Sequence, residues 1–214
     1  SYFIDYLKLN FLEPKMVGPK ISDLYSNSEE MFGAGDLFNY VYAVMYSLQY
    51  RQIYADFLGL DFSRIPLPGG AEVFRALVPL GQELVALHLL DETHPKLAKP
   101  SIRFVGQGDN RLAEKKHIKL DNGKMMINAT QWFEDVPEAS VEFAIGGYQP
   151  LKKWLHDRAE KGGKNPSPGR VLSEDDVLHY RRMVVALTET QRVMNEIDAA
   201  IDAHGGWPGA FKTE

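Results

Sequence analysis

The sequence contains no cysteine among its 214 residues. Disulfides and thiolate metal sites are therefore excluded, which fits a protein of the reducing cytoplasm. No run approaches the 18 or so consecutive apolar residues of a membrane-spanning helix, and no basic segment followed by an apolar one opens the chain. We therefore expect neither a membrane partner nor secretion. Because the chain also begins without methionine, we expect it to be a fragment of a longer protein.

Sequence motifs for catalysis are absent as well. There is no phosphate loop of the form GxxxxGK[ST], no HExxH zinc motif and no GxSxG nucleophile motif. His88 and His94 flank Asp91 and Glu92, but such a group near a predicted helix end is far more often incidental than a metal site. We expect no catalytic residue, no metal and no bound cofactor in this chain.

The chain lacks an excess of positive charge, because 29 Asp and Glu outnumber 24 Lys and Arg and the formal net charge is −5. This balance argues against nucleic-acid binding, because neutralising phosphates requires lysine and arginine. The basic residues are nevertheless concentrated in two segments. Residues 96–124 hold eight Lys or Arg against three acids, and residues 152–170 hold six against two. A basic face on an acidic body and ordinary solvated loops account for this distribution equally well.

Three segments carry the apolar spacing of helices, namely residues 36–58, 71–90 and 173–203. The first is typical of a helix, a bend and a second short helix, with Asp36 as N-cap and Gly59 as the C-terminal stop. Pro79 should kink the second helix or mark its first turn. The third begins at Ser173-Glu-Asp-Asp176, which matches a capping box with aspartate in the place of glutamate.

The hydrophobic period changes between residues 91 and 149. Ile102–Val105 is typical of a strand, and Asp121-Asn-Gly-Lys124 is a turn suited to positive φ that predicts a β-hairpin. Val141–Ile145 favours one more strand, and residues 2–7 favour another whose sheet partners lie upstream. The sequence therefore predicts an α+β fold, in which long helices pack on a small, mostly antiparallel sheet drawn from residues 102–145.

Beyond the sheet, Pro150 suits the first residue of a helix. Residues 161–169 are rich in Gly, Pro, Asn and Ser and predict a loop with little to bury. Gly205-Gly206 should end the last helix, and we expect residues 207–214 to fray.

Four ordered segments resemble a known family. They are DLFNYVYAVMYSLQYRQIYADFLGLDFSRIPLP from Asp36, FRALVPLGQELVALHLL from Phe74, VPEASVEFAIGGYQPLKKWLHDR from Val136 and LSEDDVLHYRRMVVALTETQRVMNEID from Leu172. Together they are similar to the C-terminal specificity region of type ISP restriction-modification enzymes, large helicase-methyltransferase proteins of prokaryotes. The similarity spans roughly residues 36–200, with a fainter echo in residues 2–25.

The resemblance implies a division of the chain. Residues 1–35 would be the end of an upstream sheet and a connecting loop, and residues 205–214 a tail. Between them, residues 36–204 would form a single C-terminal specificity domain. Within that domain we expect helical parts at 36–90 and 150–204 and a β-rich part at 100–147.

The resemblance also implies a function. The family's methyltransferase domain binds S-adenosylmethionine and methylates adenine, whereas the C-terminal region recognises and positions the DNA target. The Gly-rich turn and the [DN]PP-aromatic motif that methylation requires are absent here. We therefore expect a non-catalytic fragment whose partners are double-stranded DNA and the methyltransferase and helicase domains of the same parent chain.

Side chains that read or hold DNA must reach base edges or phosphates, which favours Arg, Asn, Gln and Lys. On composition and predicted loop position alone, the candidates are Arg103, Gln107, Asn110, Arg111, Lys115, Lys116, Lys119, Asn122, Lys124, Gln131, Lys152 and Lys153. Two other classes of protein stay open. One is a scaffold that packs on the methyltransferase or translocase parts, and the other, least favoured because of the missing motifs, is a free-standing enzyme.

Overall fold

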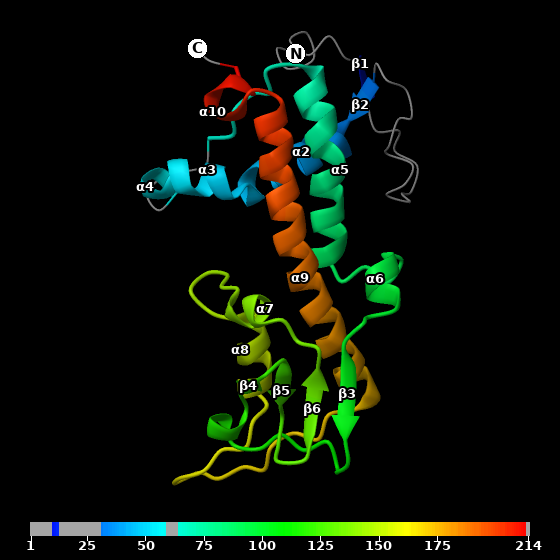
Figure 1. The fold of residues 1–214 in the computed structure, drawn as a ribbon, viewed down its shortest axis with the longest axis vertical. Helices are drawn as coiled ribbons and strands as arrows, with labels where there is room; N and C mark the ends of the chain where they lie inside the picture. Colours follow the sequence, from blue (N-terminus) through cyan, green and yellow to red (C-terminus); the bar gives the residue numbers. More distant parts are fainter. Residues whose placement is uncertain (1–9, 13–30, 59–63, 213–214) are drawn as a thin grey trace. The chain divides into compact units, whose positions relative to one another are not determined.

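The computed structural model describes residues 10–12, 31–58 and 64–212. The chain divides into two compact units, one formed by Ser1–Ala86 with Arg192–Glu214 and the other by Leu87–Gln191. The fold is α+β, as predicted, because helices pack on a four-stranded antiparallel sheet in the second unit (Figure 1). The predicted strand at 2–7 and the predicted stop at Gly59 lie outside the described residues. The grouping of residues 36–204 into one specificity domain stays a prediction.

The first unit is mainly helical. Its elements are β1 (Asn10–Leu12), β2 (Met31–Gly33), α2 (Ala34–Tyr46), α3 (Leu48–Ile53), α4 (Ala55–Leu58), most of α5 (Ala71–His88), the C-terminal part of α9 (Glu174–Ala203) and α10 (Gly206–Gly209). The strands β1 and β2 pair in parallel. Among the described residues, no helix is both long and apolar enough to cross a membrane.

The helix α2 begins earlier than the sequence predicts. Gly33 is the N-cap, and Asp36 lies inside the first turn, where its Oδ2 accepts a hydrogen bond of 2.8 Å from the Gly33 N–H. The predicted N-cap at Asp36 is therefore wrong, because its carboxylate caps from the third helical position instead. The predicted bend falls at Ser47, whose Oγ accepts from the Tyr50 N–H and donates to Asp198 Oδ1 at 2.6 Å.

The helix α5 is continuous through Pro79, which lies in its interior and not in its first turn. Pro79 faces solvent, so the hydrogen bond that proline cannot donate is missing on the exposed side of the helix. The buried face of α5 is the one that the sequence predicts and includes Phe74, Leu77 and Leu84.

The chain after Gly206 does not fray, contrary to expectation. Phe211 is 5% exposed and forms a bridge with Pro68, and the Gly69 N–H donates to the Ala210 carbonyl at 2.8 Å. The described part of the tail up to Lys212 is thus packed on the Ile65–Pro68 connector. The aromatic ring of Phe211 supplies enough apolar surface to hold it there.

The second unit carries the sheet. Its strands are β3 (Arg103–Gly106), β4 (Leu120–Asp121), β5 (Lys124–Met126) and β6 (Gln131–Glu134), in the order β3-β6-β5-β4. Its helices are α6 (Pro95–Ala98), the 3-10 helix η2 (Lys115–His117), α7 (Glu138–Glu142), α8 (Pro150–His156) and the N-terminal part of α9. The predicted hairpin is confirmed as β4–β5, with Asn122 at φ 46° and Gly123 at φ 77° in its turn.

The core of this unit lies between the sheet and α9. The ring of Phe133 on β6 packs 4.8 Å from that of Phe104 on β3 and 4.4 Å from that of Tyr180 on α9, measured between ring centroids. The predicted capping box at the start of α9 is confirmed, because Ser173 Oγ accepts from the Asp176 N–H and Asp176 Oδ2 accepts from the Ser173 N–H, both at 3.1 Å.

The predicted strand at Val141–Ile145 is wrong. Residues Glu138–Glu142 form α7, which begins after Pro137 and buries Ser140 and Val141 as neighbours on one turn. The apolar and polar residues alternate only once here, and one alternation does not distinguish a strand from a single helical turn.

Candidate nucleic-acid interface

The two basic segments of the sequence lie side by side in the second unit. The Leu112 N–H donates to the Arg170 carbonyl at 3.0 Å, the Leu172 N–H to the Asn110 carbonyl at 2.9 Å and the Glu160 N–H to the Ala113 carbonyl at 3.2 Å. Residues 110–114 are therefore held against Glu160 on one side of the loop 161–169 and against residues 170–172 on the other.

This junction depends on a glycine. A Cβ on Gly169 would collide with the Leu112 carbonyl oxygen, so only glycine lets the two backbones come this close. The Gly169 carbonyl in turn accepts a hydrogen bond of 3.0 Å from Arg111 Nη1. The Arg111 guanidinium, whose Nε also donates to Asp109 Oδ2 at 3.1 Å, therefore holds the two segments together.

Several lysines around this junction point into solvent without a carboxylate partner in the described part of the chain. Of the predicted candidates these are Lys119 before β4 and the half-exposed Lys152 on α8, whereas Lys115 on η2 is exposed but lies within the electrostatic reach of Asp157. Unpaired exposed ammonium groups are the ones most readily available to phosphates, because no ion pair must first be broken.

Lys116 and Lys153, two further candidates, do form ion pairs. Lys116 Nζ lies 2.9 Å from Glu114, and Lys153 Nζ lies 2.8 Å from Asp157. The side-chain hydrogen bond with Glu114 raises the pKa of Lys116, so this lysine keeps its charge. Because these pairs are exposed and surface pairs contribute little, both lysines can exchange their carboxylate for a phosphate.

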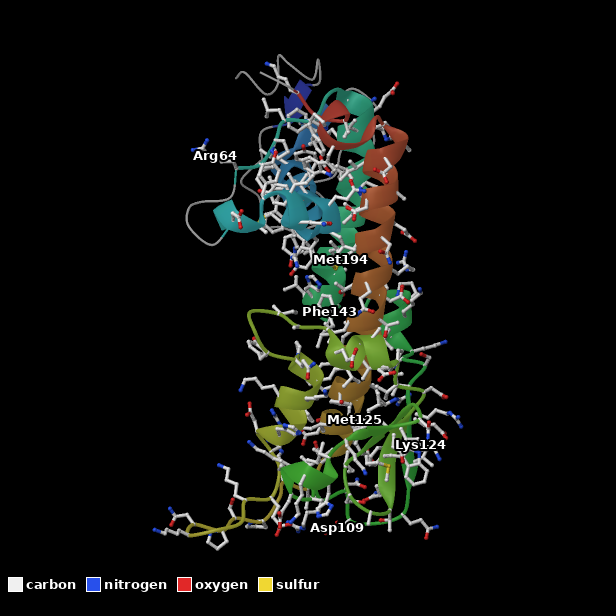
Figure 2. The ribbon with its side chains drawn as sticks, turned by 60° about the vertical axis from the view of Figure 1, so that its left-hand side comes forward. Arg64, Asp109, Lys124, Met125, Phe143 and Met194 are labelled. Carbon is white, nitrogen blue, oxygen red and sulfur yellow. The ribbon has the colours of Figure 1, made fainter. Side chains whose placement is uncertain are left out.

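Two candidates lie on the face of the sheet that points away from α9. Lys124 on β5, labelled in Figure 2, places its Nζ 4.9 Å from the centre of the Trp132 ring on β6. Arg103 on β3 binds Glu134 at 2.8 Å and Asp135 at 3.2 Å. The charge of Arg103 is thus shared with two acids, whereas that of Lys124 lies over an aromatic face.

Asn110 and Gln131 are bound to each other rather than presented to solvent. Gln131 is only 2% exposed, its Oε1 accepts from the Asn110 N–H at 2.9 Å and its Nε2 donates to Asn110 Oδ1 at 2.6 Å. Asn110 Nδ2 also donates to the Leu172 carbonyl at 3.3 Å. These amides therefore position the loop after β3. In the sequence they are candidates only because they are polar. The hydrogen bonds between them join residues 21 positions apart, so no local sequence pattern predicts them.

Gln107 and Asn122 lie at exposed turns. The Gln107 side chain has no hydrogen-bond partner among the described residues, whereas Asn122 donates to Asp121 Oδ1 at 3.1 Å. Sequence reasoning missed three other residues of this region, Lys161, Lys164 and Asn165, which are all exposed. Their signal is a Lys-Gly-Gly-Lys-Asn run, but such a run by itself predicts only a loop. DNA binding by the candidate residues stays a prediction.

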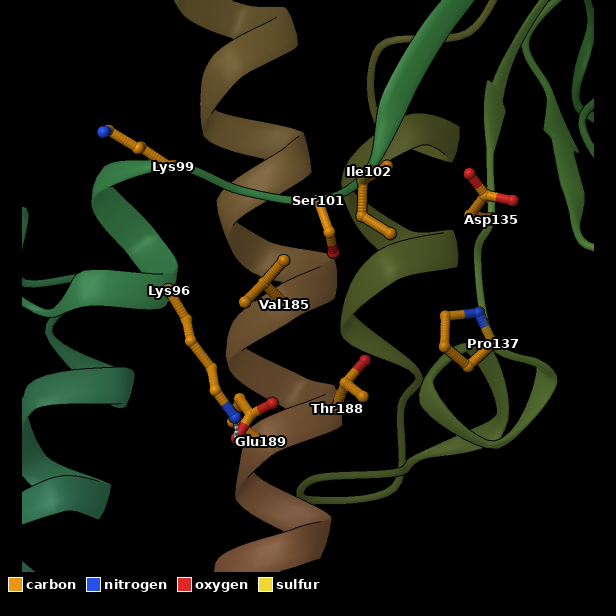
Figure 3. Close-up of a pocket in the computed structure, with 9 residues that line it drawn as sticks. All are labelled: Lys96, Lys99, Ser101, Ile102, Asp135, Pro137, Val185, Thr188 and Glu189. Atoms are coloured by element: carbon orange, nitrogen blue, oxygen red, sulfur yellow. Dashed lines mark hydrogen bonds and ion pairs between the residues drawn. The ribbon is translucent and has the colours of Figure 1, made fainter.

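A pocket of about 320 Å³ lies beside α9 in the same unit (Figure 3). Lys96 and Glu189 form an ion pair of 2.5 Å on its wall, and Asp135 is already bound to Arg103. In the part of the chain that the structure describes, no group of three His, Asp or Glu side chains could hold a metal ion. Lys96, Glu189 and Asp135 on the pocket wall are thus already engaged in ion pairs.

The comparisons with known proteins identify the family. The profile of the Type ISP C-terminal specificity domain matches residues 13–196, so the chain belongs to that family, and the resemblance seen in the sequence is confirmed. No curated protein matches the chain.

Three solved structures share the fold. A nuclease-deletion mutant of the Type ISP restriction-modification enzyme LlaGI, in complex with a DNA substrate mimic, is 25% identical with a TM-score of 0.57 over 78% of this chain and 14% of that one. The ATP-dependent Type ISP enzyme LlaBIII bound to DNA is 23% identical, with a TM-score of 0.56 over 83% and 11% of the two chains. The DrdV–DNA complex is 22% identical, with a TM-score of 0.56 over 77% and 18%. The chain spans less than a fifth of the length of each.

Proposed function

We propose that this chain recognises and positions the DNA target of a restriction-modification DNA methyltransferase and is not itself catalytic. The observation that carries the proposal is the junction of the two basic segments. It gathers Lys115, Lys116, Lys152 and Lys153 around one part of the second unit. Membership of a specificity-domain family and the DNA substrate mimic in the LlaGI complex also support the proposal of DNA recognition.

The methyl transfer would then take place outside this chain. We propose that the parent protein binds S-adenosylmethionine and methylates adenine through another domain, with further helicase or nuclease parts where the parent has them. The parent would act on DNA in the prokaryotic cytoplasm. The role of the present residues would be to bind phosphates and to read base edges.

The test is a charge reversal of Lys115, Lys116 and Lys119 to Glu. Duplex affinity should fall for every sequence, and the slope of log affinity against log salt should decrease by roughly one unit for each phosphate that the variant no longer neutralises. Fluorescence anisotropy over a series of salt concentrations measures both quantities. A control triple of Arg64→Glu, Arg75→Glu and Lys99→Glu makes the same change in net charge at exposed residues outside the junction.

If the junction triple and the control triple lower affinity equally, net charge alone explains the effect. If neither changes affinity or salt slope, these lysines are solvated surface and the scaffold function becomes the better proposal. One observation favours such a role for the first unit. Phe38, Leu48 and Ile53 on α2 and α3 are 55%, 46% and 52% exposed, and a contiguous patch of such side chains would be typical of a protein interface.

A further inference from the structure

The loop Lys161–Gly169 projects from the second unit. Its base is held by backbone hydrogen bonds, and its tip is exposed. Lys161 and Ser167 exchange two backbone hydrogen bonds of 2.9 Å, which closes the loop as a short antiparallel ribbon. The tip from Gly162 to Pro166 is exposed throughout and extends away from the body of the unit (Figures 1 and 2). No described residue packs on it, so stability of the fold does not explain its composition.

The base of the ribbon is fixed from several directions. One side is held by the Glu160 N–H on the Ala113 carbonyl, and the other by Gly169 against the Leu112 carbonyl and by Arg111 on the Gly169 carbonyl. Beyond it, the guanidinium of Arg170 binds both carboxylate oxygens of Asp176 at 2.9 to 3.2 Å.

The returning side of the loop is restrained by proline. Pro166 in the tip and Pro168 in the base each fix φ, so the chain there samples few conformations despite the two glycines on the outgoing side. A ribbon with a fixed base and a partly rigid tip loses little conformational entropy on binding. Its direction is therefore set before a partner arrives.

The chemistry of the tip matches duplex DNA. The ammonium groups of Lys161 and Lys164 have no carboxylate partner among the described residues, and the Asn165 side chain has no hydrogen-bond partner there. A narrow loop closed by one antiparallel bridge can enter the major groove, which is about 12 Å wide, and asparagine pairs with N6 and N7 of adenine through two hydrogen bonds. Lys164, directly before this amide, and Lys161, at the base of the ribbon, would contact the phosphates that flank the groove.

We propose that the Lys161–Gly169 ribbon enters the major groove of the DNA target, where Asn165 reads an adenine and Lys164 binds a phosphate. This inference rests on the proposed function and adds a specificity-determining residue to it. Arg111 is then a positioning residue, because it holds the base of the ribbon through the Gly169 carbonyl.

The experiment selects binders from a pool of duplexes with a randomised core, using the proposed parent protein. Asn165→Ala should lose the preference for adenine at one position, by roughly 5- to 150-fold, and should retain the preferences at other positions. Lys164→Ala should weaken binding to all duplexes alike and lower the salt slope by roughly one unit. Asn195→Ala removes the same amide and Arg75→Ala removes a positive charge at exposed residues outside the ribbon and outside both basic segments, and both variants should behave as the unmodified chain.

Folding does not obscure this result, because the tip makes no packing contact with described residues and the unfolding midpoints of the variants should be unchanged. A second measurement tests the groove. Replacing the selected adenine with 7-deazaadenine removes N7 and should weaken binding of the unmodified chain but not of Asn165→Ala.

Two failures are distinguishable. If the unmodified chain shows no salt-dependent duplex binding, the proposed function fails and the inference fails with it. If binding is present and sensitive to the Lys115, Lys116 and Lys119 reversal, but Asn165→Ala keeps every base preference, only the ribbon inference is overturned. An unchanged affinity for the 7-deazaadenine duplex would likewise exclude major-groove reading by this residue.

Discussion

Replacing Gln131 with alanine separates a structural role from a DNA-reading one. The Gln131 side chain makes three hydrogen bonds, two with Asn110 at 2.6 and 2.9 Å and one with Asn128 Nδ2 at 3.1 Å. Because Gln131 is 2% exposed, its removal leaves the Asn110 N–H without its partner in a largely buried place. A net loss of about 1 kcal/mol for each of the three bonds, with more for the orphaned group, gives a cost of about 3–4 kcal/mol.

Urea unfolding of the full chain measures this cost as a shift in midpoint. Gln107→Ala is the matched control, because it removes the same amide from an exposed residue of the neighbouring turn and should change the free energy of unfolding by less than about 0.5 kcal/mol. At temperatures where Gln131→Ala is folded, its DNA sequence preference should equal that of the unmodified chain. Unchanged stability together with an altered preference would refute the structural role.

Three further outcomes follow from the fold. Phe211→Ala should destabilise the first unit by about 3–5 kcal/mol in thermal unfolding, because the buried Phe211 ring stacks on Trp207 with centroids 4.1 Å apart. An unchanged transition would mean that the C-terminal segment frays after all. Ser173→Ala should lower the free energy of unfolding by about 1 kcal/mol, measured as a shift in the urea midpoint. An unchanged midpoint would mean that the Ser173 cap does not stabilise the fold. Titration of S-adenosylmethionine into this chain should give no heat above dilution in calorimetry, whereas a micromolar dissociation constant would reveal a site that the sequence motifs missed.

The elements that could be predicted from the sequence are those determined by local chemistry. Asn and Gly tolerate positive φ better than other residues, so the pair Asn122-Gly123 predicts the turn of the hairpin. Ser173 and Asp176 form the N-terminal cap of α9 within one helical turn. The helical faces of α5 and α9 likewise follow from the spacing of apolar residues.

The features that sequence reasoning missed depend on contacts between distant segments. Phe211 packs because Pro68, which lies far earlier in the chain, is beside it in space. The candidate interface shows the same limit. Arg111 can donate to the Gly169 carbonyl only because folding brings the two backbones close together. Residue type and loop position therefore predicted a set of candidate residues but not the role of each.

The order of the sheet has a consequence for synthesis of the protein. The central strand β6 is the last of the four to leave the ribosome, and it must insert between β3 and β5, which precede it. The segment around Leu112 then still lacks its partner Arg170, and Phe133 still lacks Tyr180. The ribosome must therefore synthesise the first turns of α9 before the two basic segments can pair and before Phe133 can pack on Tyr180. A product terminated earlier would carry most of the lysines without the framework that brings them together.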